Sequence, residues 1–181
     1  MKKVSFAVLI GIFCLAMLAG CSSQEGQAQD GYGEGGMGDT MHTYFFDYTV
    51  NSAYLCDSFE GYTAAQEGHQ LLVADVTVKN TFQESIPMFD TDFQIQWSSD
   101  ADDAYDVPIT YYMDALSDQQ LPSEYDLGVD EERSGLLVFE VPEGETDFSI
   151  SYLELFDDES EGDVFFVYFT AEPQSDDSVA A

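Results

Sequence analysis

Apolar residues at every second position mark most of the chain between Tyr44 and Thr170. The pattern is clearest from Leu71 to Asn80, where one face is formed by Leu72, Ala74, Val76 and Val78. Successive side chains of a strand point to opposite faces of the sheet, so this spacing predicts strands with one buried face. No segment carries a 3.6-residue apolar stripe over three helical turns. The alternation therefore predicts an all-β fold.

Several further segments are expected to be strands, and together they favour one architecture. They are residues 44–50, 93–97, 137–141, 148–152 and 164–169, the last of them apolar on both faces. Parallel strands need crossovers of a dozen or more residues, which are usually helical, and here only 114–120 could form one helical turn. Two packed antiparallel sheets give the apolar faces a common interior. We expect an immunoglobulin-like antiparallel β-sandwich of about seven strands.

The N-terminus has the features of an exported protein. Lys2 and Lys3 precede a mostly apolar run from Val4 to Leu18, which is shorter than the ~20 residues of a membrane-spanning helix and so indicates a signal peptide. Leu18-Ala19-Gly20-Cys21 resembles the bacterial lipobox. The resemblance implies cleavage after Gly20 and a diacylglyceryl group on the Cys21 sulfur. The alternative is a plain secretory signal in which Cys21 is incidental.

Both ends of the mature chain are expected to lie outside the folded domain. Ser22 to Thr40 contains six glycines in nineteen residues and no apolar periodicity, which is typical of a flexible tether with a span of about 25 Å. The last residues are small and polar. We therefore expect a signal peptide at 1–20, a lipidated tether at 21–40, the sandwich at 41–170 and a loose tail at 171–181. Acylated Cys21 would hold the protein on the outer face of a bacterial cytoplasmic membrane.

Charge excludes several classes of partner. The chain has 36 acidic and 4 basic residues, a formal net charge of −32, and only Lys79 and Arg133 are basic beyond the signal peptide. Nucleic acids and anionic membrane surfaces are bound mainly through Lys and Arg, so neither is an expected partner of the domain. With 45% hydrophobic residues the chain is too apolar for an acidic disordered segment. It should fold, and we expect a monomer.

Two strands carry a resemblance to a known family. Gly68 to Asn80 ends in Val-Lys-Asn, and Gly135 to Pro142 reads Gly-Leu-Leu-Val-Phe-Glu-Val-Pro, with Phe93-Gln94-Ile95 and an extended loop at 121–128 between them. Together these segments resemble the telokin-like, immunoglobulin-like domain of unknown function found in many bacterial lipoproteins. The similarity covers about residues 43–170. It implies an extracytoplasmic immunoglobulin-like sandwich and brings no established catalytic residue.

Clustered acids suggest a weak calcium site. One cluster follows the predicted 93–97 strand and contains Asp100, Asp102, Asp103 and Asp106, and a second lies between Asp157 and Asp163. Ca²⁺ takes six to eight oxygen ligands, and extracellular sites bind it weakly. Neither cluster has the EF-hand spacing. A solvated acidic surface, screened by salt, is the alternative.

The other reactive side chains do not form a catalytic pattern. Cys56 is the only thiol of the mature chain besides Cys21 and has no basic neighbour in sequence, so it is expected to be a small packed residue. His42 and His69 occur without a zinc-binding motif, and no Gly-x-Ser-x-Gly elbow accompanies them. A hydrolase built on a pair of carboxylates stays open as an alternative. We expect no enzyme activity and, calcium apart, no cofactor.

Aromatic residues raise the question of a ligand. Exposed Trp and Tyr rings form sugar-binding platforms, and the candidates are Trp97, Tyr111, Tyr112 and Tyr125. Most other rings occupy inward strand positions and are expected in the core. The sequence therefore favours a lipid-anchored, non-catalytic binding module whose partner is an envelope protein or a glycan. A structural envelope lipoprotein without a dedicated ligand is the alternative.

Overall fold

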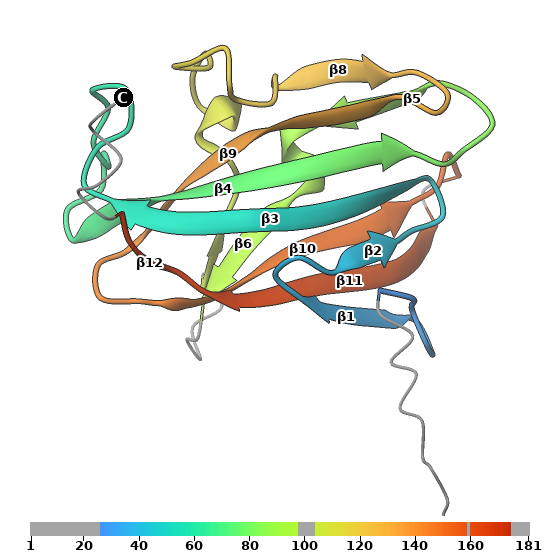
Figure 1. The fold of residues 1–181 in the computed structure, drawn as a ribbon, viewed down its shortest axis with the longest axis horizontal. Coiled ribbons are helices and arrows are strands. Elements are labelled where there is room, and N and C mark those ends of the chain that lie inside the picture. The colour runs from blue at the N-terminus through green and yellow to red at the C-terminus, as the bar shows by residue number, and fades with distance from the viewer. Residues whose placement is uncertain (1–25, 98–103, 159, 175–181) are drawn as a thin grey trace, which may run out of the picture.

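The computed structural model describes residues 26–97, 104–158 and 160–174, which form a sandwich of two β-sheets (Figure 1). These residues contain twelve strands: β1 (Tyr32–Gly36), β2 (Thr40–His42), β3 (Phe46–Cys56), β4 (His69–Asn80), β5 (Ile86–Phe89), β6 (Gln94–Trp97), β7 (Tyr105–Asp106), β8 (Glu124–Leu127), β9 (Glu132–Pro142), β10 (Asp147–Leu155), β11 (Glu161–Thr170) and β12 (Glu172–Pro173). Two 3₁₀ turns, η1 (Asp90–Asp92) and η2 (Ile109–Tyr111), complete the described elements. No helix among the described residues is long and apolar enough to cross a membrane.

The sheets follow the predicted sandwich architecture. One sheet has the order β1-β11-β10-β6-β7 and the other β12-β3-β4-β9, with β2 beside β3, while β5 and β8 form a separate pair. The long neighbours β3, β4, β9 and the β10–β11 pair are antiparallel. The predicted all-β sandwich is confirmed. The strand count exceeds seven because short edge segments also pair.

The main core lies between the two sheets, as the period-two spacing of apolar residues predicts. Val76 on β4, Phe139 on β9 and Ile150 on β10 are each 0% exposed and belong to one apolar cluster. Val76 lies opposite Val50 on β3 and Gly135 on β9. The period-two pattern therefore identifies the inward face of each long strand correctly, because that pattern follows directly from strand geometry.

A smaller second core covers the outer face of β4 and β9. Leu71 and Val73 on β4 pack with Val138 on β9 and Ile109 on η2, and all four are at most 2% exposed. Part of the outward face of β4 is thus buried, because the connections containing η2 and Tyr62 cover it. This explains why Val73 is apolar at a position that strict alternation assigns to the outside.

The predicted flexible tether of residues 21–40 is wrong for its described part, residues 26–40, which is hydrogen-bonded to the sandwich. Strand β1 pairs in parallel with β11, from Tyr32 opposite Val164 to Gly36 opposite Tyr168. Its glycines allow close packing: a Cβ on Gly33 would lie 2.5 Å from Cδ1 of Phe165, and one on Gly35 would lie 2.7 Å from Sδ of Met41. A composition typical of flexible coil therefore belongs here to an edge strand whose backbone lies on buried side chains.

Other boundaries also differ from the prediction. The tail begins later than expected, because Ala171 is buried and β12 pairs in parallel with β3. No helical turn forms at 114–120, where Gln120 instead accepts hydrogen bonds from the Leu116 and Ser117 amides. The second acidic cluster, at 157–163, lies only partly in a turn, because β11 already begins at Glu161. Cys21 lies outside the described residues.

A Gly33→Val substitution should weaken the attachment of β1. The added side chain must displace the Phe165 ring, and overpacking of this kind costs about 1 to 3 kcal/mol of unfolding free energy. Gly36→Ala is the matched control, because a Cβ there has only an ordinary contact of 3.5 Å with Asp39 Oδ2. Urea unfolding of both variants measures the difference. Equal midpoints would show that β1 does not pack on Phe165.

Candidate binding groove

A groove of about 800 Å³ opens at one end of the sandwich. Three segments far apart in sequence form it: the turn that leads into β3, the stretch from the end of β4 through β5 to η1, and the end of β10 with the turn into β11. Figure 1 shows the β2–β3 and β10–β11 turns together at the right-hand end of the sandwich. Volumes of this size are typical of ligand sites. We call it the aromatic groove.

Four rings form one wall of the aromatic groove. Tyr44 lies 5.0 Å from Phe45, 5.7 Å from Phe82 and 5.3 Å from Phe156, measured between ring centroids. Several of these pairs are edge-to-face, which is a favourable arrangement of aromatic quadrupoles. The outermost ring is Tyr44, whose side chain is 58% exposed. The rings therefore support one another and still present an open aromatic surface.

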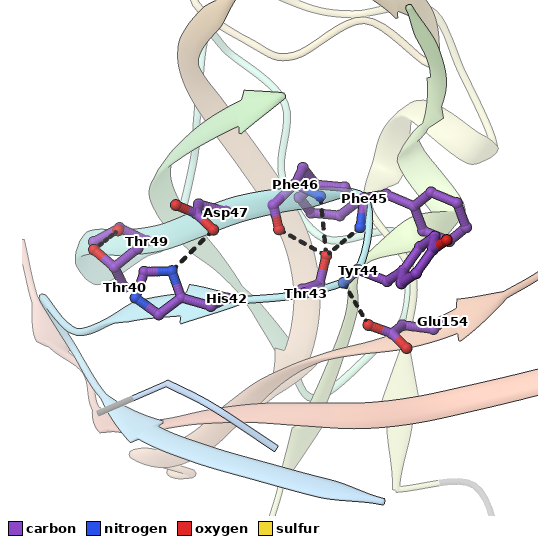
Figure 2. Close-up of polar contacts among 9 residues, drawn as sticks. All are labelled: Thr40, His42, Thr43, Tyr44, Phe45, Phe46, Asp47, Thr49 and Glu154. Carbon is purple, nitrogen blue, oxygen red and sulfur yellow. Dashed lines mark hydrogen bonds and ion pairs between the residues drawn. The ribbon is translucent and has the colours of Figure 1, made fainter. Parts of the chain in front are cut away.

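A buried carboxylate fixes the turn that carries Tyr44. Glu154 on β10 is 5% exposed, and its Oε1 accepts a 2.7 Å hydrogen bond from the Tyr44 amide (Figure 2). Its Oε2 accepts a 3.0 Å hydrogen bond from the Asp163 amide. Gly162 leaves the space that this carboxylate needs, because a Cβ there would lie 2.5 Å from Oε2. Glu154 on β10 thus connects the turn that carries Tyr44 with the start of β11.

Thr43 closes the same turn from within. Its Oγ1 accepts hydrogen bonds from the Phe45 and Phe46 amides at 3.3 and 3.1 Å and donates one of 2.6 Å to the Phe46 carbonyl (Figure 2). The backbone amides of Phe45 and Phe46 are therefore satisfied within the turn, and that of Tyr44 is satisfied by Glu154 from β10. Such a turn holds the Tyr44 ring in place before any ligand arrives.

Carboxylates are the charged side chains of the aromatic groove. The lining residues include Glu84, Asp92, Asp157 and Asp158 and, among the described residues, no Lys or Arg. Asp158 accepts hydrogen bonds from the Ser160 hydroxyl at 2.6 Å and the Ser160 amide at 3.1 Å, which lower its pKa. The groove therefore combines apolar rings with negative charge.

Asp92 differs from the other groove carboxylates. Burial raises its pKa from 3.8 to about 6, although the Phe89 amide donates a 2.7 Å hydrogen bond to Oδ2 and opposes that shift. Nearby Asp90 adds a smaller repulsion in the same direction as burial. The Asp92 carboxyl group consequently gains its proton at a pH well above that of an ordinary aspartate.

The predicted calcium ligands fall largely outside the described part of the chain. Asp100, Asp102 and Asp103 lie outside the described residues, and only Asp106 lies within them. Its Oδ1 accepts hydrogen bonds from the Val107 amide at 2.8 Å and the Tyr112 hydroxyl at 3.1 Å, while burial raises its pKa. Within the described ranges no three His, Cys, Asp or Glu side chains gather as a metal site would require. The calcium hypothesis stays a prediction.

A thermal titration distinguishes calcium coordination from screening. A coordinated ion should raise the melting temperature saturably with Ca²⁺, and Asp102→Asn or Asp106→Asn should reduce that rise. Diffuse screening of the acidic surface should instead give equal, non-saturating effects of Ca²⁺ and Mg²⁺. Equal effects of the two ions on the melting temperature would contradict a coordinated calcium site.

The predicted sugar platform is not assembled among the described residues. Tyr111 and Tyr112 pair with each other at η2, 5.0 Å apart, and neither has a ring contact with Trp97. Trp97 is half-buried and lines a separate cavity of about 520 Å³ beside Phe148 and Tyr168. Tyr125 packs under the Arg133 guanidinium, 4.6 Å from its ring centroid. These four aromatic residues therefore do not share one surface.

The remaining candidates have local structural contacts. His42 Nδ1 lies 2.9 Å from Asp47 Oδ1 across the β2–β3 pair (Figure 2). His69 is partly buried at the start of β4. Cys56 is half-buried, and burial raises the pKa of its thiol, which is unfavourable for a nucleophile.

Sequence analysis missed the aromatic groove. A partial signal existed, because Phe82 and Phe156 are aromatic residues outside the segments expected to be strands, whereas Tyr44 belongs to the 44–50 run that was expected to be one. Large rings in turns have no strand core to enter, so they are candidates for an exposed site. Their convergence depends on the sheet topology, which the alternation does not determine.

Comparison with known proteins places the fold in a group of bacterial β-proteins. The ycdA protein of Bacillus subtilis, a proposed lipoprotein, is similar at a TM-score of 0.55 and 15% identity, with 73% of this chain and 38% of that chain covered. This chain thus spans well under half of that protein. The yjhA protein of Bacillus subtilis is similar at a TM-score of 0.50 and 21% identity, with 65% and 80% covered. These likenesses concern the fold.

The family assignment comes from the sequence itself. A comparison with curated proteins finds no match. The family model described as a domain of unknown function, DUF4352, matches residues 35–163, which include both groove turns and most of the sandwich. That range is most of the chain. The chain therefore belongs to the DUF4352 family.

Proposed function

We propose that the protein is a non-catalytic, lipid-anchored binding module of the bacterial cell surface and that its ligand occupies the aromatic groove. The observation that carries this proposal is the exposed Tyr44 ring, held by Glu154 and by neighbouring rings over a cavity of ligand size. The solvent-facing side of the Tyr44 ring is exposed, and exposed aromatic surface lowers solubility. Its rigid presentation therefore favours a binding function over a purely structural one.

The chemistry of the lining residues favours binding over catalysis. The described groove is lined by rings, aliphatic side chains, hydroxyl groups and carboxylates, with neither His nor Cys among them. Nucleophilic catalysis usually pairs a nucleophile with a neighbouring base such as His. The proposed role is therefore recognition.

The position of the N-terminus supports anchoring at the groove end. Gly26, the first described residue, accepts a 2.7 Å hydrogen bond through its carbonyl from the His42 amide, two residues before Tyr44. Cys21 lies five residues upstream of Gly26. Five residues span at most about 18 Å, so an acylated Cys21 would keep the aromatic groove close to the outer face of the cytoplasmic membrane.

The anchor has its own test. Cys21→Ser should release the protein from the membrane or leave an unprocessed precursor, because the sulfur that carries the diacylglyceryl group is lost. Cell fractionation and mass spectrometry of the membrane-extracted wild type measure both outcomes. The matched control is Cys56→Ser, which should leave acylation unchanged. An unmodified N-terminus on the wild-type protein would contradict the anchor.

Site-specific photo-crosslinking tests the binding function. A photoreactive phenylalanine analogue replaces Tyr44 in the aromatic groove or, as the control, Tyr111 at η2, which is equally exposed at 60% against 58%. Irradiation of intact cells should give a discrete adduct from position 44 and none from position 111. Absence of an adduct at 44, or the same adducts at both positions, would contradict a dedicated ligand in the groove.

A further inference from the structure

We propose that the aromatic groove binds an amphipathic peptide segment that presents a Lys or Arg side chain beside large apolar side chains. This inference rests on the proposed function and specifies its ligand. Three features of the groove support this inference: exposed apolar surface, carboxylates without basic lining residues, and aromatic rings that line the same groove.

The apolar part of the ligand follows from the exposed side chains. Phe89, Leu153 and Leu155 line the groove together with the ring wall and are 41%, 38% and 60% exposed. Residues 153 and 155 lie on one face of β10, because Glu154 between them points into the sandwich. Covering this surface removes apolar area from water, which favours a ligand with large apolar side chains.

The cationic part follows from charge. Glu84 and Asp157 are exposed carboxylates on two different groove segments, and Asp158 lies beside Asp157 on the turn into β11. None of the described lining residues is basic, so no cation of the groove itself neutralises them. A ligand that covered these carboxylates without a positive charge would leave them desolvated and unpaired.

The protein already contains the contact that such a ligand would make. Arg133 stacks on the Tyr125 ring at 4.6 Å, and its Nη2 donates a 3.0 Å hydrogen bond to Glu131 Oε1. An aromatic face and a carboxylate thus hold one guanidinium together. Phe156, Asp157, Phe82 and Glu84 all line the groove, so rings and carboxylates are both available to one ligand there.

Other occupants fit these features less well. A second copy of the chain brings 36 acidic residues against 4 basic ones and would be repelled. Anionic lipid headgroups meet the same repulsion. A peptide that carries both cationic and apolar side chains matches the charge and the apolar surface at once.

The experiment uses the full mature lipoprotein in discs of neutral phosphatidylcholine. Its probe is a fluorescently labelled synthetic peptide of alternating Lys and Leu with one Phe, followed by anisotropy at 50 mM salt. Two reference peptides replace every Lys by Glu or every Leu and Phe by Ser. Only the peptide with both features should bind measurably.

Matched protein variants locate the binding. Glu84→Lys combined with Asp157→Lys should weaken binding at least about tenfold, whereas Asp114→Lys, an exposed reversal away from the groove, should change it less than about twofold. Tyr44→Ser should weaken binding about fivefold, and Tyr105→Ser, at 52% exposure on β7, should leave it unchanged. Circular dichroism confirms that each variant is folded.

Four outcomes would overturn the inference. Equal weakening by Asp114→Lys would show diffuse attraction to the acidic surface. Binding of the Glu-substituted peptide, or self-association of the lipoprotein through the groove, would show the wrong ligand class. An adduct at position 44 in cells, combined with no binding of the Lys peptide, would rule out a cationic ligand. It would leave the proposed binding function unaffected.

Discussion

A Val76→Asp variant should be unfolded at 25 °C. Val76 is fully buried at the centre of β4, between Val50 on β3 and Gly135 on β9, so no water reaches the introduced carboxylate. Burying an unpaired charge costs several kcal/mol at least, against a total stability of about 5 to 15 kcal/mol for a typical domain. Far-UV circular dichroism and urea unfolding measure the loss.

Two further variants calibrate that result. Phe139→Ala, also at a fully buried position, should lower the unfolding free energy by about 3 to 5 kcal/mol through lost contacts and a residual cavity. Thr81→Asp adds the same charge as Val76→Asp but at an exposed side chain just beyond β4, and should stay within about 0.5 kcal/mol of the wild type. If Val76→Asp and Thr81→Asp unfold alike, the assigned strand register is wrong.

Asp92 should make the domain more stable at pH 4 than at pH 7. Its folded pKa of about 6 exceeds the ordinary value of 3.8, so the folded state holds the proton more tightly than the unfolded chain. The resulting stabilisation is complete below pH 3.8 and is lost as the pH rises through about 6. Each pKa unit corresponds to about 1.4 kcal/mol, so the difference is about 2 to 3 kcal/mol.

An Asp92→Asn variant isolates this contribution from the repulsion among the other acids. The amide oxygen of Asn can still accept the Phe89 N–H, while the ionisable group is gone. Asp92→Asn should therefore be more stable than the wild type at pH 7 by about 1 to 3 kcal/mol and show a smaller slope between pH 4 and 7. Asp126→Asn, at an exposed position on β8, is the control. Parallel pH profiles for the wild type and Asp92→Asn would contradict the raised pKa of Asp92.

The long strands were predictable because their side-chain period alone decides which face is buried. Val76 and Phe139 follow that rule, and both are in the core. β1 was not predictable, because Gly33 and Gly35 suit a flexible coil and a tightly packed edge strand equally well. The fit to Phe165 and Met41 that distinguishes the two depends on partners far away in sequence.

The aromatic groove could not be predicted as a site from the sequence for a related reason. Its rings come from the turn before β3, the connection after β4 and the turn after β10, and only the three-dimensional packing brings them together. The period of 148–152 places Glu154 at an inward position, but the sequence does not indicate which backbone amides its carboxylate accepts hydrogen bonds from. Local patterns describe strands well but not sites assembled from turns.

Hydrogen–deuterium exchange of the membrane-bound lipoprotein, with and without the Lys-containing peptide, tests the central claim most directly. The aromatic groove as the ligand site predicts slower exchange in segments 43–46, 82–89 and 152–158, with no change in 109–113. Protection centred instead on 94–97 and 147–149, which border the Trp97 cavity, would contradict it, as would weak protection spread over the whole acidic surface.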